Sequence, residues 1–172
     1  ILYCGTNSGV FKTTNLGENW KLIGLQNTQV CAFYVYNNYY FAGTNNGIRI
    51  SNDGGTSWAS NVTGDSVISL YSFSEKLLAG TNHGVKVSTD FGNNWVSIGL
   101  NSYRINSFTN MADTLLTSTN IGVFATTNMG NNWINLGPKQ QTCGLVIFDN
   151  KIYAGGVNCV WRKDANLLTG VS

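Results

Sequence analysis

Side chains that could carry acid–base or ligand chemistry are few in this sequence. Its 172 residues include eight Asp and Glu residues and a single histidine, His83. His83 lies in the segment 80–84 (Gly-Thr-Asn-His-Gly), which predicts a turn where His83 takes a positive φ rather than the role of a base. No phosphate-binding glycine motif and no Cys-x-x-Cys pair occurs. We therefore expect no cofactor, no metal site and no catalytic residue.

The composition favours an exported β protein that does not bind nucleic acid. Charged residues make up 10% of the chain, against about 25% in typical proteins, and the formal net charge is only +2. Abundant Gly and aromatic residues indicate strands and turns rather than disorder. No apolar run approaches the roughly 20 residues of a membrane-spanning helix. Few Lys and Glu among many Asn, Ser, Thr and Gly predict a secreted or bacterial cell-surface location.

One motif, Ser/Thr-x-Asp/Asn-x-Gly-x-x-Trp, recurs four times, at residues 13–20, 51–58, 88–95 and 126–133. We expect its Asp or Asn to close a turn by bonding the backbone two residues on, and its Ser or Thr to bond the loop backbone. Its Gly should take a positive φ, and its Trp should begin the next strand as a mostly buried anchor. The structural residues assigned in this way are Asn15, Gly17, Trp20, Asp53, Gly55, Trp58, Asp90, Gly92, Trp95, Asn128, Gly130 and Trp133.

An alternative role for Asp53 and Asp90 is cation binding. A hard cation requires several oxygen ligands, however, and two of the four copies carry a neutral Asn at this position. The pattern therefore favours a structural turn.

A second marker, Gly/Ser-Thr-Asn-x-Gly, begins at residues 5, 43, 80 and 118, so the repeat length is 37–38 residues. Each repeat is expected to hold four antiparallel strands, A to D. In the second repeat these cover 30–36, 40–43, 48–51 and 58–61. In the fifth repeat they cover 143–148, 151–154, 160–162 and 167–171. The chain opens at strand B of the first repeat.

These boxes resemble the Asp-box, or BNR repeat, of sialidases and related β-propellers. The resemblance implies an all-β fold, a β-propeller of four-stranded antiparallel blades, with about 4.5–5 blades in this chain. Residues 1–172 then form a single propeller or the C-terminal part of a larger one. In the second case, missing blades or another chain complete the ring. The ending Val160-Trp161-Arg162-Lys163 is similar to that of propellers in exported bacterial proteins, which favours missing blades before Ile1.

The resemblance also places ligands on the face formed by the D-to-A and B-to-C loops, opposite the boxes. Amide and aromatic side chains there suit a glycan or protein ligand, although ordinary solvated turn residues would look the same. The candidate ligand-binding residues are Asn46, Asp65, Asn82, His83, Tyr103, Arg104 and Gln140. We interpret Arg49 differently, as a residue that packs between blades.

The resulting hypothesis is a non-catalytic, exported interaction or carbohydrate-binding module. One alternative is a fragment of a sialidase-like or xyloglucanase-like glycosidase. Such enzymes generally use two carboxyl groups at one bond, and only Asp65 would supply one on the loop face. Another alternative is an assembly protein like the photosystem II stability factor, whose binding surface is Arg-rich. This chain has three arginines, at scattered positions.

The four cysteines are Cys4, Cys31, Cys143 and Cys159. The simplest expectation is that they are buried free thiols. The alternative is a disulfide between the first and last blades that uses Cys4 or Cys159.

Overall fold

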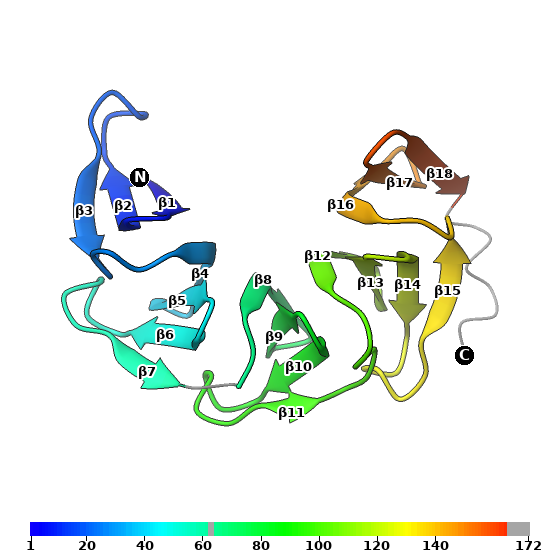
Figure 1. Cartoon of the computed structure of the whole chain (residues 1–172), viewed down its shortest axis with the longest axis horizontal. Helices are drawn as coiled ribbons and strands as arrows, with labels where there is room; N and C mark the ends of the chain where they lie inside the picture. The colour runs from blue at the N-terminus through cyan, green and yellow to red at the C-terminus, as the bar shows by residue number, and fades with distance from the viewer. Residues whose placement is uncertain (62–63, 165–172) are drawn as a thin grey trace. The chain divides into compact units, whose positions relative to one another are not determined.

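The computed structural model describes residues 1–61 and 64–164, and these form antiparallel β-sheets (Figure 1). The first sheet contains β1 (Leu2–Thr6), β2 (Gly9–Thr13) and β3 (Lys21–Gly24). The second contains β4 (Val30–Tyr36), β5 (Tyr39–Thr44), β6 (Gly47–Ser51) and β7 (Ala59–Asn61). The third contains β8 (Val67–Phe73), β9 (Lys76–Thr81), β10 (Gly84–Ser88) and β11 (Val96–Ser97). The fourth contains β12 (Ile105–Met111), β13 (Thr114–Thr119), β14 (Gly122–Thr126) and β15 (Ile134–Gly137). The fifth contains β16 (Thr142–Phe148), β17 (Lys151–Gly156) and β18 (Val160–Asp164).

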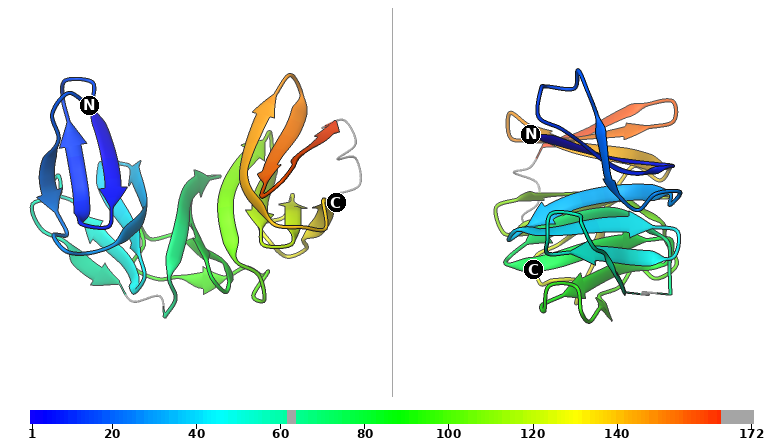
Figure 2. Two further views of the ribbon diagram at one scale, coloured as in Figure 1. Left: turned by 45° about the horizontal axis from the view of Figure 1, so that its top comes forward. Right: turned by 90° about the vertical axis from the view of Figure 1, so that its left-hand side faces the viewer.

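Strands that follow one another in sequence pair with one another in every sheet. In the first sheet, for example, β1 and β2 lie side by side, and Thr6 pairs with Gly9 (Figure 2). The chain divides into two compact units, residues 1–79 with 88–95, and residues 80–87 with 96 onward. The boundary falls inside the third sheet. None of the described segments forms a helix with the length and apolarity that a membrane span requires.

The sequence predicted these strands well. Strand β4 has the predicted bounds, and the first sheet does begin with the second strand of the repeat. The motif tryptophan was predicted to begin the last strand of each repeat. In the second sheet this prediction was wrong by one residue, because strand β7 begins at Ala59 and Trp58 lies in the turn. The strand predicted over 167–171 lies outside the described residues.

Tight hairpins connect the strands. Asn37 and Asn38 between β4 and β5 both have positive φ, and this geometry matches the twist of the paired strands. In the hairpin of β9 and β10, the residue with positive φ is Gly84, the first residue of β10, at +94°. The prediction of a positive φ at His83 was therefore wrong. Instead, the backbone N–H of His83 donates to Thr81 Oγ1 at 3.0 Å.

The apolar core lies between consecutive sheets. We call the face of a sheet that packs on the preceding sheet its leading face, and the opposite face its trailing face. In the first unit, Phe41 on a trailing face packs against Leu77 and Ala79 on the next leading face, and all three are buried. In the second unit, Leu116 packs against Ile152 in the same way. Each sheet therefore depends on a neighbour to remove its apolar side chains from water.

Two of the motif tryptophans, Trp58 and Trp133, hold their sheets against the preceding ones. Trp133 donates its indole N–H to the carbonyl of Ile98 on the preceding sheet, at 2.8 Å. A Cβ at the neighbouring Gly99 would lie 3.0 Å from this indole, so glycine permits the close approach. Trp58 likewise lies against Gly24 of the first sheet, where there is no room for a Cβ.

The motif tryptophans were all expected to be mostly buried, but their observed burial differs along the chain. Trp58, Trp95 and Trp133 are half-buried, whereas Trp20 is 43% exposed. The expectation that all four are mostly buried was wrong for Trp20, because the described residues include no sheet that precedes the first one.

Replacing Trp133 by Ala should lower the free energy of unfolding by about 3 kcal/mol, near the lower end for a core tryptophan, because the indole is half-buried. The change also leaves the Ile98 carbonyl without this donor. Urea unfolding followed by circular dichroism measures the loss. The neighbouring Ile134, which is exposed, provides the control Ile134→Ala, and equal losses in the two variants would contradict the fastening role of Trp133.

Candidate functional site

The recurring turn uses its acidic group for internal hydrogen bonds. The Ser51 hydroxyl donates to Asp53 Oδ1 at 2.8 Å, and the Ser57 hydroxyl donates to Oδ2 at 2.6 Å. The backbone N–H of Ser57 donates to both carboxylate oxygens, at 2.9 and 3.0 Å. The carboxylate thus bonds the backbone four residues on, not two as predicted. The Ser51 hydroxyl makes the shorter connection instead, since it accepts from the N–H groups of Asp53 and Gly55.

These hydrogen bonds favour the charged form of the carboxylate. The Ser57 hydroxyl and N–H, followed by the Ser51 hydroxyl, lower the pKa of Asp53 to about 2. The pKa of Asp90 is also lowered, first by the N–H of Asn94 and then by its side chain.

Copies with Asn keep the same arrangement without a charge. Asn15 Oδ1 accepts from the Thr13 hydroxyl at 2.7 Å and from the N–H of Asn19 at 3.0 Å. Asn128 accepts from the N–H of Asn132 at 3.0 Å. An oxygen acceptor is the shared requirement, and the described residues contain no cluster of three or more His, Cys, Asp and Glu side chains placed to hold a metal ion.

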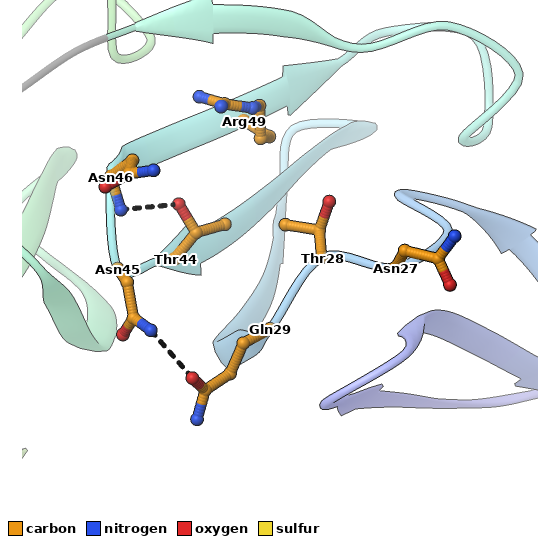
Figure 3. Close-up of a pocket in the computed structure, with 7 residues that line it drawn as sticks. All are labelled: Asn27, Thr28, Gln29, Thr44, Asn45, Asn46 and Arg49. Carbon is orange, nitrogen blue, oxygen red and sulfur yellow. Dashed lines mark hydrogen bonds between the residues drawn. The ribbon is translucent and has the colours of Figure 1, made fainter.

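A polar cavity of about 240 Å³ lies at the other end of β6 from the turn (Figure 3). The connection from β3 to β4 and the hairpin from β5 to β6 form its walls, and these are the D-to-A and B-to-C loops where the sequence predicted a ligand face. Its lining residues are Asn27, Thr28, Gln29, Thr44, Asn45, Asn46 and Arg49.

Hydrogen bonds hold the walls of this cavity together. Asn45 Nδ2 donates to Gln29 Oε1 at 2.7 Å, which joins the two loops. Thr44 Oγ1 accepts from the N–H of Asn46 at 3.2 Å and donates to the carbonyl of Gly47 at 2.9 Å, which fixes the hairpin. Arg49 Nη1 donates to the Ser60 hydroxyl at 2.6 Å.

The structure brings only part of the predicted site to this cavity. Asn46 lines it, and Asp65 is next to Ser66, whose hydroxyl donates to Asn45 Oδ1 at 3.3 Å. Thr28 and Gln29 were not among the predicted candidates, and Arg49 was assigned to packing between blades. Arg49 also lines the cavity, at a position where other repeats have Phe, Lys or Trp. This departure from the repeat is the sequence feature that could have identified Arg49 as a residue of the cavity.

The other candidates lie on separate loops of the second unit. The carbonyl of Tyr103 accepts from the N–H of Gly84 at 3.0 Å, which places Tyr103 beside the hairpin of Asn82 and His83. The Tyr103 ring stacks on Phe124, with centroids 5.5 Å apart, so that face of the ring is already used. Arg104 Nε donates to Asn106 Oδ1 at 3.1 Å, and Gln140 Nε2 donates to Cys159 Sγ at 2.5 Å.

The cysteines differ from the expectation of buried thiols. All four are free, three are exposed and Cys159 is half-buried. Cys31 and Cys143 lie at irregular positions of β4 and β16, where the pairing register skips one residue. This irregularity separates them from the core faces of their sheets.

Comparison of the sequence with protein-family models and with curated proteins finds no match. Solved structures do match. An ancestral GH74 enzyme is similar to this chain with a TM-score of 0.75 and 25% identity, over 88% of this chain and 25% of its own. The extracellular domain of BT4673 from B. thetaiotaomicron is similar with a TM-score of 0.80 and 15% identity, over 96% of this chain and 25% of its own. YCF48 from Cyanidioschyzon merolae gives 0.67 and 12%, over 96% and 66%.

The sheets are blades of a β-propeller. This chain spans a quarter of the length of the GH74 enzyme and of the BT4673 domain. The antiparallel sheets and the likeness to these solved structures confirm the predicted fold class, an all-β propeller.

Replacing Asp53 by Asn should preserve the fold and weaken the acid sensitivity of its stability. The folded-state pKa of about 2 lies below the ordinary Asp value near 3.9. The ionised Asp53 therefore stabilises the fold above about pH 4, and this contribution is lost as the pH falls towards about 2. Asn does not titrate but keeps the acceptor oxygen, so the melting temperature of the variant should fall less over this range. Thermal unfolding at several pH values measures the effect.

The control is Asp53→Ala, which removes the acceptor and should lower the melting temperature at every pH. An unchanged acid dependence in Asp53→Asn would contradict the assigned role of the charge.

Proposed function

We propose that the chain is part of an exported Asp-box propeller that binds a neutral carbohydrate, without catalysis, at the cavity of the second blade. The observation that carries the proposal is the chemistry of the lining, which consists of amide and hydroxyl side chains with one guanidinium and no carboxylate. Amide groups both donate and accept hydrogen bonds, so they can match the hydroxyl groups of a sugar. The recurring Ser/Thr-Asp/Asn-Gly-Trp turns support the Asp-box assignment.

The size of the cavity indicates what it can hold. About 240 Å³ is below the roughly 300–1,000 Å³ of sites that enclose drug-sized ligands. The cavity therefore suits one sugar unit at the end or along the side of a longer glycan. Arg49 lies above Thr44 and Gln29 lies below it in the close-up, so a bound sugar would meet donors from both (Figure 3).

Likeness to an extracellular domain supports the exported location. A second candidate function, a fragment of a glycosidase, is favoured by the 25% identity to a GH74 enzyme. The lining of the cavity has no carboxyl group, which argues for binding rather than hydrolysis. Hydrolysis of a glycosidic bond generally requires two carboxyl groups at one bond, and Asp53 and Asp90 are used in the turns at the other ends of their blades.

Binding of the purified chain to a glycan array, followed by titration calorimetry with the strongest ligand, tests the proposal. Arg49→Ala should weaken binding about tenfold or more, since a lost hydrogen bond to a charged group costs about 1.5–3 kcal/mol. Lys86→Ala is the matched control, because Lys86 occupies the equivalent position in the third blade. Equal affinity in both variants, or a larger loss in Tyr103→Ala, would contradict a site at this cavity.

The glycosidase alternative predicts turnover of aryl glycosides, with Asp65→Asn abolishing it. A panel of chromogenic substrates measures this. Binding without turnover is the result that the proposed function predicts, and turnover that depends on Asp65 would replace it with the enzyme.

A further inference from the structure

The first blade has two lysines at a place where the next three blades have apolar residues. Lys12 of β2 and Lys21 of β3 pair directly across the two strands. The corresponding pairs in the next three blades are Ile50 with Ala59, Val87 with Val96, and Ala125 with Ile134. Like charges directly opposite one another destabilise a sheet. This departure from the repeat is therefore unfavourable unless an opposite charge compensates it.

These lysines lie on the trailing face of the first blade, towards the second blade. Lys12 also pairs with Tyr3 of β1, and its Nζ lies 5.8 Å from the centroid of the Tyr3 ring. The Tyr3 ring stacks on Phe33 of β4, and its hydroxyl lies 2.6 Å from the hydroxyl of Tyr40 of β5. Both of these contacts join the first blade to the second, within one compact unit.

The surroundings of the lysine pair do not depend on any residue before Ile1. A blade that preceded the first one would meet its leading face, which is the opposite face. The strand that opens each later repeat would pair with the free edge of β1, whereas Lys21 lies on β3 at the other edge of the sheet.

A hollow of about 380 Å³ lies beside the lysine pair. Its lining consists of Lys12, Thr14, Asn15, Asn19, Trp20, Lys21 and Ile23. This lining contains two ammonium groups and no carboxylate. Glu18 belongs to the same turn but is exposed and does not line the hollow. Neither lysine forms an ion pair within residues 1–61 and 64–164.

The turn of the first blade also leaves amide groups for a ligand. Asn15 uses its Oδ1 to accept from the Thr13 hydroxyl and from the N–H of Asn19, so the turn does not use its Nδ2. In the third blade, Asn94 Nδ2 donates to the second carboxylate oxygen of Asp90 at 2.6 Å. Asn15 has no second oxygen, so the Asn19 amide is not held in this way. The hollow therefore has amide donors in addition to its two ammonium groups.

We propose that this hollow binds the oxyanion group, a carboxylate, phosphate or sulfate, of a small organic molecule. An oxyanion between Lys12 and Lys21 replaces their mutual repulsion by attraction and accepts charge-assisted hydrogen bonds from both. The volume of about 380 Å³ falls within the roughly 300–1,000 Å³ of small-molecule sites. The remainder of the molecule can then lie against the amides of Asn15 and Asn19. This site is separate from the cavity with Arg49, so it goes beyond the proposed function.

A double substitution that copies the third blade tests the site. Lys12→Val together with Lys21→Val creates the pair that Val87 and Val96 form there, so the variant should fold. The matched control is Lys76→Thr together with Lys151→Thr. It removes the same number of charges and introduces the residue that begins the corresponding strand of the fourth blade. Circular dichroism establishes that both variants are folded.

Thermal unfolding in sodium sulfate, at an ionic strength kept constant with sodium chloride, measures binding of a free oxyanion. An anion that binds the folded chain raises its melting temperature. Sulfate also stabilises proteins in general, because it is excluded from their surfaces. The unchanged protein and the control should therefore show a larger rise than the Lys12→Val, Lys21→Val variant. Equal rises in all three proteins would overturn the proposal.

Titration calorimetry with glucuronate, glucose and acetate distinguishes an organic anion from a free ion. Each protein in this experiment also carries Arg49→Ala, which removes the contribution of the cavity in the second blade. Glucuronate should bind the protein with both lysines about tenfold or more tightly than the Lys12→Val, Lys21→Val variant. Glucose, which has no charge, should not distinguish the two. Acetate that binds as tightly as glucuronate, or glucuronate that binds both proteins equally, would overturn the assignment to an organic anion.

Discussion

A four-stranded blade cannot bury both of its own faces, and the rest of this structure depends on that constraint. Apolar residues such as Phe41 and Leu116 leave water only when the next blade covers them. Neighbouring blades are held together where a tryptophan of one blade contacts a glycine of the preceding blade. Trp133 reaches across to the Ile98 carbonyl, and Gly99 leaves room for its indole. In the fifth blade, Trp161 of β18 lies against Gly137 in a similar way.

The two ends of each blade differ in the chemistry of their side chains. At one end, Asp53 and Asp90 lose their freedom as acids or ligands, because the turn uses their oxygens as hydrogen-bond acceptors. Asn15 performs the same task without a charge, so the task is structural. At the other end the hairpins and connections keep polar side chains that the core does not use, and in the second blade these surround a cavity.

Local features of the sequence could be predicted because neighbouring residues determine them. The 37–38-residue period located strand β4 with correct bounds, and the turn residues located the hairpins. Predictions that depended on more distant contacts succeeded less well. Trp20 has the same motif as Trp133 but differs in burial, since burial depends on the preceding blade. Gln29 and Arg49 reach one cavity from two loops, a meeting that spacing along the chain does not show.

Hydrogen exchange of four equivalent backbone amides tests most directly whether blades stabilise one another. Gly17, Gly55, Gly92 and Gly130 each donate their N–H to the Ser or Thr hydroxyl of their own turn, at 2.8–3.1 Å. The local hydrogen bond is thus the same, and only the cover from a preceding blade differs. The account predicts faster exchange at Gly17 than at the other three. Equal protection at all four would contradict it, because each turn would then be stable without its neighbour.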